Sequence, residues 1–444
     1  MKKITTAAAL LLVCAMGITG CSDSILTSSD TSGESKPAEI WTANDDDIVA
    51  WSGSETLSDE EKEFYNIAFK EFYSEYAFFI DMNQIDEYEE DYQTDLQLYR
   101  QQMIEMLAEE RVVLKKAQEA GLDVLTAEEA EEVSEYYENN MQAYYTAFAA
   151  EAKEALGSDA DKDALLAKER ELFLDYIVKF GLSEEIFLKW QTNTYIYSKM
   201  MDKITEDVTV SKEAIDTYID TTQKEAEAMY NESVATYEAA TDYQAVWIPD
   251  GSRNIKFILL AIDSSDAAEL SAARAESNAD NDALDKLRDE MLATVKGQAD
   301  AAMEKLNSGE ASFEDVMKEY AANYYEGAEK NLTLLIYGSE RTMKEIYDAA
   351  YALEKPGDIT DLIATDRGYY IIQYVSDAEI TDEQMEDVRK ATEQGMIAER
   401  QAELKDKTIA QWMDEVAYEY NYDALNYEKP SESDKTSSQA ESKE

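Results

Sequence analysis

Apolar residues recur at helical spacing over a long part of the chain that contains no proline. Between about residues 57 and 245 they fall three and four positions apart, as on one face of an amphipathic helix. Local signals divide this stretch into separate helices. Gly121 is typical of a helix end, and Thr126 with Glu129 matches a capping box that starts the next helix. The pattern therefore predicts a domain of packed helices over residues 57–245.

The pattern changes after the motif Trp247-Ile248-Pro249-Asp250-Gly251, where proline and glycine indicate a domain boundary. Residues 255–262 and 368–375 are β-branched and aromatic runs, and both are typical of buried strands. Between these strands, helical patterns extend over about residues 264–307, 312–321 and 343–352. We therefore predict a compact α+β module in this part of the chain.

A last helical pattern follows the module and is opened by a capping box formed by Thr381 and Gln384. Its apolar positions include Ile409, Trp412, Met413 and Val416. A separate tail would not need these side chains, so we predict that residues 380–422 pack back on the first helical domain. The predicted fold class is α+β: a helical domain, made of N-terminal helices and a C-terminal return helix, with an α+β domain inserted.

The first twenty residues resemble a processing signal. Two lysines precede the apolar run 4–18, which is too short for a stable transmembrane helix. The run ends in Ile18-Thr19-Gly20-Cys21, which resembles the bacterial lipobox, in which the cysteine sulfur receives the lipid. We predict a lipoprotein signal peptide over residues 1–20 and a lipid anchor on Cys21. The alternative is an ordinary secretory signal with a chance cysteine.

The predicted anchor places the protein at a cell membrane, on the extracytoplasmic face. Residues 21–56 are predicted to be a flexible tether, within which the more apolar patch 40–51 could dock on the body. Residues 427–444 are predicted to be a disordered tail. The only other cysteine, Cys14, lies in the segment to be removed, so the mature chain cannot form an intramolecular disulfide.

Composition removes several classes of function. The chain has no histidine, which excludes histidine-based acid–base catalysis, Ser-His-Asp and Cys-His nucleophiles, and the usual zinc sites. With 97 acidic and 40 basic residues, its net charge of −57 disfavours nucleic acid and anionic head groups as partners. Cationic or partly unfolded polypeptides remain possible partners, although solubility outside the cell is the simplest reason for the acidity. We predict no cofactor and no metal site.

Four stretches of the α+β module carry a resemblance to a known family. They are Ile255–Leu260, Ser312–Tyr320, Ile346–Thr360 and Gly368–Ile372. With them, residues 253–377 resemble the parvulin-type (PpiC-like) peptidyl-prolyl isomerase domain of PrsA- and SurA-type extracytoplasmic foldases. Two segments of the helical stretch, Lys115–Leu122 and Val208–Tyr218, resemble the N-terminal domain of these foldases.

The resemblance also implies where site residues lie. The family places histidines on the first and last strands, and Phe257 and Tyr370 occupy these positions here. The family's nearby Cys or Asp falls at Asn323, while Met343 and Ile346 fall at apolar positions of the proline-binding pocket. A tyrosine at position 370 can donate a hydrogen bond, whereas a phenylalanine at position 257 cannot.

The implied function is a membrane-anchored folding factor that binds newly exported polypeptides and carries a peptidyl-prolyl isomerase domain. X–Pro isomerisation has a barrier of about 18–20 kcal/mol and breaks no bond, so missing histidines do not exclude it. Two functions stay open: a chaperone with isomerase activity, and a non-catalytic chaperone or scaffold that uses the parvulin-like fold only for binding. The long proline-free helical stretch disfavours a third class, the solute-binding lipoproteins. The sequence leaves the oligomeric state open.

Overall fold

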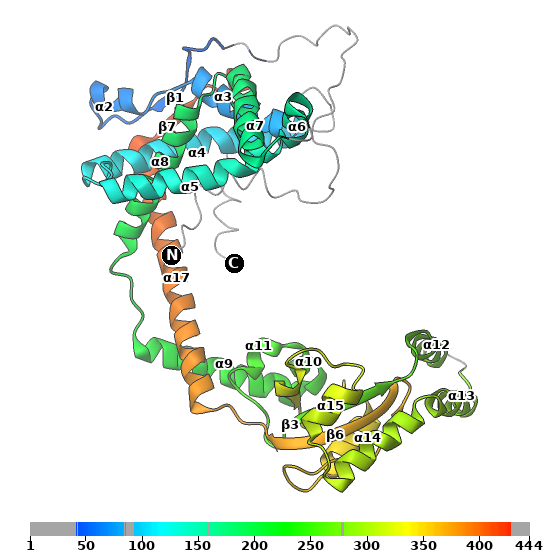
Figure 1. Cartoon of the computed structure of the whole chain (residues 1–444). Coiled ribbons are helices and arrows are strands. Elements are labelled where there is room, and N and C mark those ends of the chain that lie inside the picture. The colour runs from blue at the N-terminus through cyan, green and yellow to red at the C-terminus, as the bar shows by residue number, and fades with distance from the viewer. Residues whose placement is uncertain are drawn as a thin grey trace. The chain divides into compact units, whose positions relative to one another are not determined.

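The computed structural model describes residues 41, 43–83, 85, 93–157, 160–276 and 279–427. The predicted signal peptide, Cys21 and almost all of the predicted C-terminal tail lie outside these residues. The chain divides into two compact units (Figure 1). The helical unit comprises the described residues up to Val208 and from Glu399 onwards, and the α+β unit comprises those from Thr209 to Ala398. Across the described residues, no helix combines the length and the apolarity that a membrane crossing needs.

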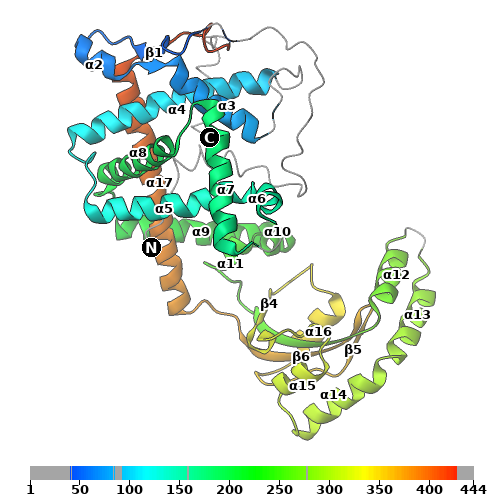
Figure 2. The ribbon, with the colours of Figure 1, turned by 45° about the horizontal axis from the view of Figure 1, so that its top comes forward.

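The helical unit is built mainly from long amphipathic helices. They are α2 (Asp59–Phe64), α3 (Phe69–Met82), α4 (Gln93–Glu119), α5 (Ala127–Thr146), α6 (Ala149–Leu156), α7 (Lys162–Ile177), α8 (Glu184–Thr205) and the second half of α17 (Asp382–Val416). Helix α8 packs against both α4 and α5, and the three can be followed in Figure 2.

The predicted helix boundaries are confirmed where capping residues mark them. The Thr126 hydroxyl accepts a hydrogen bond from the Glu129 backbone N–H, and the Thr126 backbone N–H donates to the Glu129 carboxylate. Thr381 and Gln384 form the same reciprocal pair before α17. Gly121, which follows α4, has a φ of +71°, the left-handed conformation that glycine adopts without strain.

A small antiparallel sheet ties the two ends of the helical unit together. Its strand order is β2 (Ile67–Ala68), β1 (Ile48–Ser52), β7 (Tyr418–Tyr420). Strand β1 belongs to the folded unit, so the predicted flexible tether does not extend to residue 56. Tyr427 is also buried, and the fold therefore includes the first residue of the predicted tail. The first difference arises because a short strand gains its stability from distant partners, and the second because the Tyr427 ring joins the core cluster of α3 and α4.

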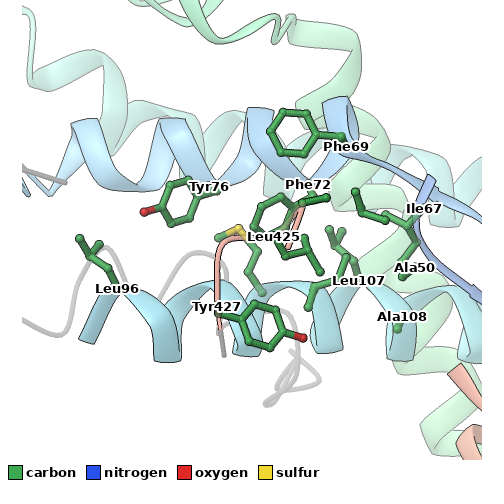
Figure 3. Packing of buried hydrophobic residues seen from close by; sticks show 14 of the residues in the cluster. Ala50, Ile67, Phe69, Phe72, Tyr76, Leu96, Leu107, Ala108, Leu425 and Tyr427 are labelled. Carbon is green, nitrogen blue, oxygen red and sulfur yellow. The ribbon is translucent and has the colours of Figure 1, made fainter. Parts of the chain in front are cut away.

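Residues from both ends of the chain share the core between α3 and α4. In Figure 3, Leu425 lies between Phe72 of α3 and Leu107 of α4, and Tyr427 belongs to the same buried cluster. The last part of α17 also packs on this unit. Its Ile409 and Trp412 side chains contact the cluster of buried residues that includes Val113, Ala117 and Met200. The C-terminal segment thus completes a core that the N-terminal helices begin.

The α+β unit contains a four-stranded antiparallel sheet with the strand order β4 (Thr333–Leu335), β3 (Arg253–Ala261), β6 (Gly368–Asp377), β5 (Ile363–Thr365). The two strands predicted from sequence are its central pair. The polar helical stretch after β3 forms α12 (Ser264–Arg274), α13 (Asn281–Ala293) and α14 (Lys296–Ser308). Helices α15 (Phe313–Tyr320) and α16 (Lys344–Ala352) follow.

The two faces of this sheet bury different sets of residues. One face packs Ile258, Leu260 and Ile371 against α14 and α15. The other face, which we call the α16 face, carries Ile255, Phe257, Leu259, Tyr370 and Ile372 and packs against α16. Figure 2 shows α16 on one side of the sheet and α14 with α15 on the other.

Helices α9 (Lys212–Glu232), α10 (Val234–Ala239) and α11 (Thr241–Gln244) also belong to the α+β unit. Tyr237 of α10 packs with Ile336, the residue after β4, and the Tyr230 hydroxyl donates to the Tyr337 carbonyl at 2.9 Å. The division between the units therefore falls at Thr209, whereas the sequence predicted helical domain through residue 245. Helical periodicity alone does not say which core a helix joins.

Candidate functional site

Phe257 and Tyr370, at the two positions where the sequence resemblance implies histidines in the family, lie on the same face of the central strand pair. Leu259 of β3 pairs directly with Tyr370 of β6, and Phe257 pairs with Ile372, so Phe257 and Tyr370 are diagonal neighbours. Their ring centroids are 5.7 Å apart, with the planes inclined by 40°. This is the tilted geometry of a favourable aromatic pair.

Met343 and Ile346 join this pair in one cluster. Ile346 is buried in α16, and Met343, the residue before α16, is partly buried against the same group. Tyr370 is only 6% exposed, while Phe257 is partly exposed. The structure thus brings four of the five predicted site residues together on the α16 face.

Asn323, the fifth predicted site residue, forms a side-chain hydrogen bond to the backbone of strand β3. Its Oδ1 accepts a hydrogen bond from the Leu259 N–H at 3.3 Å, and the adjacent Ala322 N–H donates to the Leu259 carbonyl at 2.8 Å. Strand β4 pairs with β3 only as far as Ile255, so the loop that carries Asn323 satisfies the edge of β3 beyond that point. Asn323 therefore has a structural role beside the residue that pairs with Tyr370.

The chemistry available on the α16 face is apolar and aromatic. Phe257 has no polar side-chain atom, and the hydroxyl groups of the two α16 tyrosines, Tyr347 and Tyr351, form hydrogen bonds with backbone atoms. The Tyr347 hydroxyl accepts from the Gly338 N–H at 2.8 Å, and the Tyr351 hydroxyl donates to the Leu335 carbonyl at 3.3 Å. Burial raises the pKa of Tyr351, so its phenol stays neutral at ordinary pH. This face offers apolar contacts that fit a proline ring.

A second candidate site, which sequence reasoning missed, is a cavity of about 410 Å³ inside the helical unit. A volume of this size lies in the usual range for ligand pockets. Most of its lining is aromatic or methionine, contributed by α3, α4, α5 and α8. These residues are Phe78, Phe79, Met82, Tyr99, Met103, Met106, Tyr137, Met141, Tyr144, Phe187, Trp190 and Tyr197.

The same cavity is lined by four glutamates, Glu75, Glu105, Glu109 and Glu110. Glu75 is only 6% exposed, and burial raises the pKa of its carboxyl well above the ordinary value. Burial also raises the pKa of Glu105 and of Glu110. Glu109 accepts a hydrogen bond from the Tyr197 hydroxyl at 2.5 Å. The cavity therefore combines an apolar wall with a concentration of carboxyl groups.

One sequence signal could have located this cavity. Glu75 lies in the run Phe69–Ile80, three positions after Phe72 and three before Phe78, on the apolar side of its helix. A carboxylate at a core position is uncommon unless it is paired or functional. The other lining residues come from helices far apart in the sequence, and no local pattern connects them.

Comparison with known proteins assigns the α+β unit. Residues 258–376 match the family model of the rotamase, PPIC-type PPIASE domain. Residues 258–376 are therefore similar to the parvulin-type domain, and the predicted resemblance of this part of the chain to that family is confirmed. The sheet, its covering helices and the preceding helical unit give the predicted α+β fold, in which helices are combined with a parvulin-like domain.

Several solved structures are similar to the chain, with low sequence identities and low TM-scores. PrsA from Bacillus cereus is 18% identical, with 88% of this chain and 99% of that chain covered and a TM-score of 0.19. The foldase PrsA from Lactococcus lactis is 14% identical, with coverages of 85% and 97% and a TM-score of 0.25. A SurA-like chaperone from Campylobacter jejuni is 14% identical, with coverages of 65% and 93% and a TM-score of 0.24. No curated protein shows a significant match.

Proposed function

We propose that this chain is an extracytoplasmic folding factor, anchored to a membrane through lipid on Cys21, that holds newly exported polypeptides. The helical unit does the holding. The parvulin-type domain provides a second polypeptide-binding surface with weak isomerase activity. The lipobox-like sequence supports the anchor, and the matched family model supports a polypeptide as the substrate.

The observation that carries this proposal is the cavity of the helical unit. Methionine side chains are flexible and polarisable, and surfaces rich in them can adapt to many partners. Aromatic side chains such as Phe78, Tyr144 and Trp190 add large apolar area for exposed segments of an unfolded chain. A folding factor needs this combination because its clients share no sequence.

Weak isomerase activity follows from the α16 face. A prolyl isomerase lowers the barrier of about 18–20 kcal/mol by binding the twisted amide better than the planar one. Phe257 cannot supply a hydrogen bond to the twisted amide, and Tyr370 is packed among apolar side chains. The face therefore keeps the apolar contacts for a proline ring and lacks the polar groups that would favour the twisted state.

The test combines two assays on the full chain. The first follows the isomerisation rate of a chromogenic X–Pro peptide with the wild type and with the double variant Phe257→His, Tyr370→His. The second follows light scattering by a chemically unfolded client. We expect aggregation to be suppressed at stoichiometric amounts of wild type, with an isomerisation rate close to the uncatalysed one. A chain that accelerates isomerisation strongly and leaves aggregation unchanged would be an enzyme instead of a holding chaperone.

A further inference from the structure

Glu75 is a buried carboxyl group that faces the cavity of the helical unit. It lies on α3 between two aromatic residues of the same helix, Phe72 and Phe78, and is 6% exposed. Its Oε2 atom has no hydrogen-bond partner among the described residues, whereas the carboxyl as a whole interacts with the Trp190 side chain. An acceptor left open in this way is costly unless a ligand or a proton satisfies it.

The groups around Glu75 add negative charge. Glu110 on α4 and Glu71 on α3 both raise the pKa of Glu75, in addition to the larger effect of burial. Arg111 on α4 lowers it, but this guanidinium is already engaged by the Glu71 carboxylate and the Asn66 carbonyl. Arg111 therefore does not form an ion pair with Glu75.

The remaining carboxyl groups of the cavity are also weakly neutralised. Glu110 accepts a hydrogen bond from the neutral Asn193 side chain and has weaker electrostatic interactions with Arg111 on α4 and Lys189 on α8. Glu105 and Glu109 bond to the neutral groups of Gln101 and Tyr197. Among the described residues, the cavity thus gathers four carboxyl groups whose hydrogen-bond donors are mainly neutral.

We propose that this cavity takes a basic side chain, arginine or lysine, of the polypeptide that the helical unit holds, with its cationic head beside Glu75 and Glu110. The inference rests on the proposed holding function and names the kind of segment that is held. The aliphatic stem of the guest would lie on Phe79, Met106 and Tyr144, as long basic side chains do on apolar surface. The Trp190 ring would add a cation–π contact.

Charge complementarity selects this occupant over a purely apolar one. A leucine or phenylalanine side chain would fill the volume but leave the Glu75 acceptor without a partner. A guanidinium or ammonium group supplies several N–H donors and a compensating charge in the same place. Clients with basic residues next to apolar ones are also drawn by the net charge of −57.

Occupation by a cation couples to proton release. Burial raises the pKa of the Glu75 carboxyl and so favours its protonated form in the empty cavity. A bound cation favours the ionised form, so the carboxyl loses its proton as the basic side chain enters. Affinity for the basic guest therefore rises with pH until Glu75 and Glu110 are ionised in the empty cavity.

The test uses the full chain and two short fluorescein-labelled peptides of alanine, leucine and phenylalanine. One peptide carries a single central arginine, and the other carries citrulline, which keeps the shape and loses the charge. Fluorescence anisotropy should show about tenfold or tighter binding of the arginine peptide, the value of one charge-assisted hydrogen bond. Calorimetry in two buffers of different ionisation enthalpy should show proton release with arginine and none with citrulline.

Two variants test whether Glu75 causes the preference for arginine. In Glu75→Gln the preference for arginine should disappear, whereas Glu135→Gln, an exposed residue of α5, should keep it. Equal binding of the two peptides to the wild type overturns the inference and leaves the holding function intact, and this outcome needs no variant. A preference that persists in a folded Glu75→Gln protein also overturns it. If neither peptide binds and no client is held, the proposed function itself fails.

Discussion

Phe257 and Tyr370 pack as diagonal neighbours on the α16 face, with ring centroids 5.7 Å apart and ring planes inclined by 40°. The sequence resemblance implies histidines in the family at these two positions. Here the pair is aromatic and belongs to the buried cluster that contains Ile346. The pair therefore contributes to the stability of the domain through apolar contact.

The Tyr370 ring should matter for stability more than its hydroxyl. Tyr370→Ala removes a ring that is 6% exposed and should lower the free energy of unfolding of the α+β unit by about 3–5 kcal/mol. Tyr370→Phe keeps the ring and should leave both stability and isomerisation rate nearly unchanged. Urea unfolding followed by circular dichroism measures the first quantity. A large fall in isomerisation rate in Tyr370→Phe would show instead that the hydroxyl is catalytic.

Gly368 should tolerate no side chain. Its φ is +136°, and a Cβ there would lie 2.1 Å from the Leu260 carbonyl oxygen of the neighbouring strand. Gly368→Ala should therefore disrupt the β3–β6 pair and cost more than about 4 kcal/mol. Gly395→Ala is the matched control, because Gly395 lies inside α17 with open space around its Cβ position. This control should stabilise the protein by up to about 1 kcal/mol. Equal melting temperatures for the two variants would refute the account of this strand pair.

Glu75 should make the helical unit less stable as pH rises. The folded-state pKa of this carboxyl is raised above its unfolded value, so the native state binds more protons. Its contribution is fully present below the unfolded pKa and is lost as pH rises through the folded pKa. Glu75→Gln should therefore stabilise the unit by about 1–3 kcal/mol at neutral pH and have little effect near pH 4.

The control for this pH dependence is Glu135→Gln, which replaces an exposed glutamate on α5. It should change stability by less than about 0.5 kcal/mol at both pH values. Urea unfolding at the two pH values measures all three proteins. If Glu75→Gln destabilised the unit more at neutral pH than in acid, the buried carboxyl would have to be ionised and paired.

The lipid anchor can be tested at the two cysteines. Cys21→Ser should abolish incorporation of labelled palmitate and release the chain from the membrane fraction, because the attacking sulfur is lost. Cys14→Ser lies in the segment predicted to be removed and should keep both the label and the membrane fractionation. Labelling that survives in Cys21→Ser would exclude Cys21 as the lipidated residue.

Local sequence signals predicted much of the fold because their causes are local. The capping boxes at Thr126 and Thr381 and the β-branched runs of β3 and β6 each act within a few residues. Strands β1 and β7 escaped prediction because they are short and pair across the length of the chain. The assignment of α9–α11 to the α+β unit depends on contacts such as Tyr237 with Ile336, which periodicity does not encode.

The candidate site on the α16 face was predictable because the sequence resemblance aligned each of its residues with a position in the family. The cavity was not, since Glu75, Tyr144 and Trp190 come from three helices whose packing is non-local. The buried glutamate within an aromatic run was the one feature that pointed to it. A residue whose type does not suit its buried position, such as this glutamate, is a useful signal of function.

The most direct test of the holding function asks whether a client enters the cavity. Benzoylphenylalanine introduced at Tyr144, which lines the cavity, is compared with the same group at Tyr136, an exposed residue of the same helix. After irradiation with a defined, chemically unfolded client, we predict a cross-linked product from position 144 and little from position 136. Equal cross-linking at both positions, or none at 144 while the client is still held, would contradict the account.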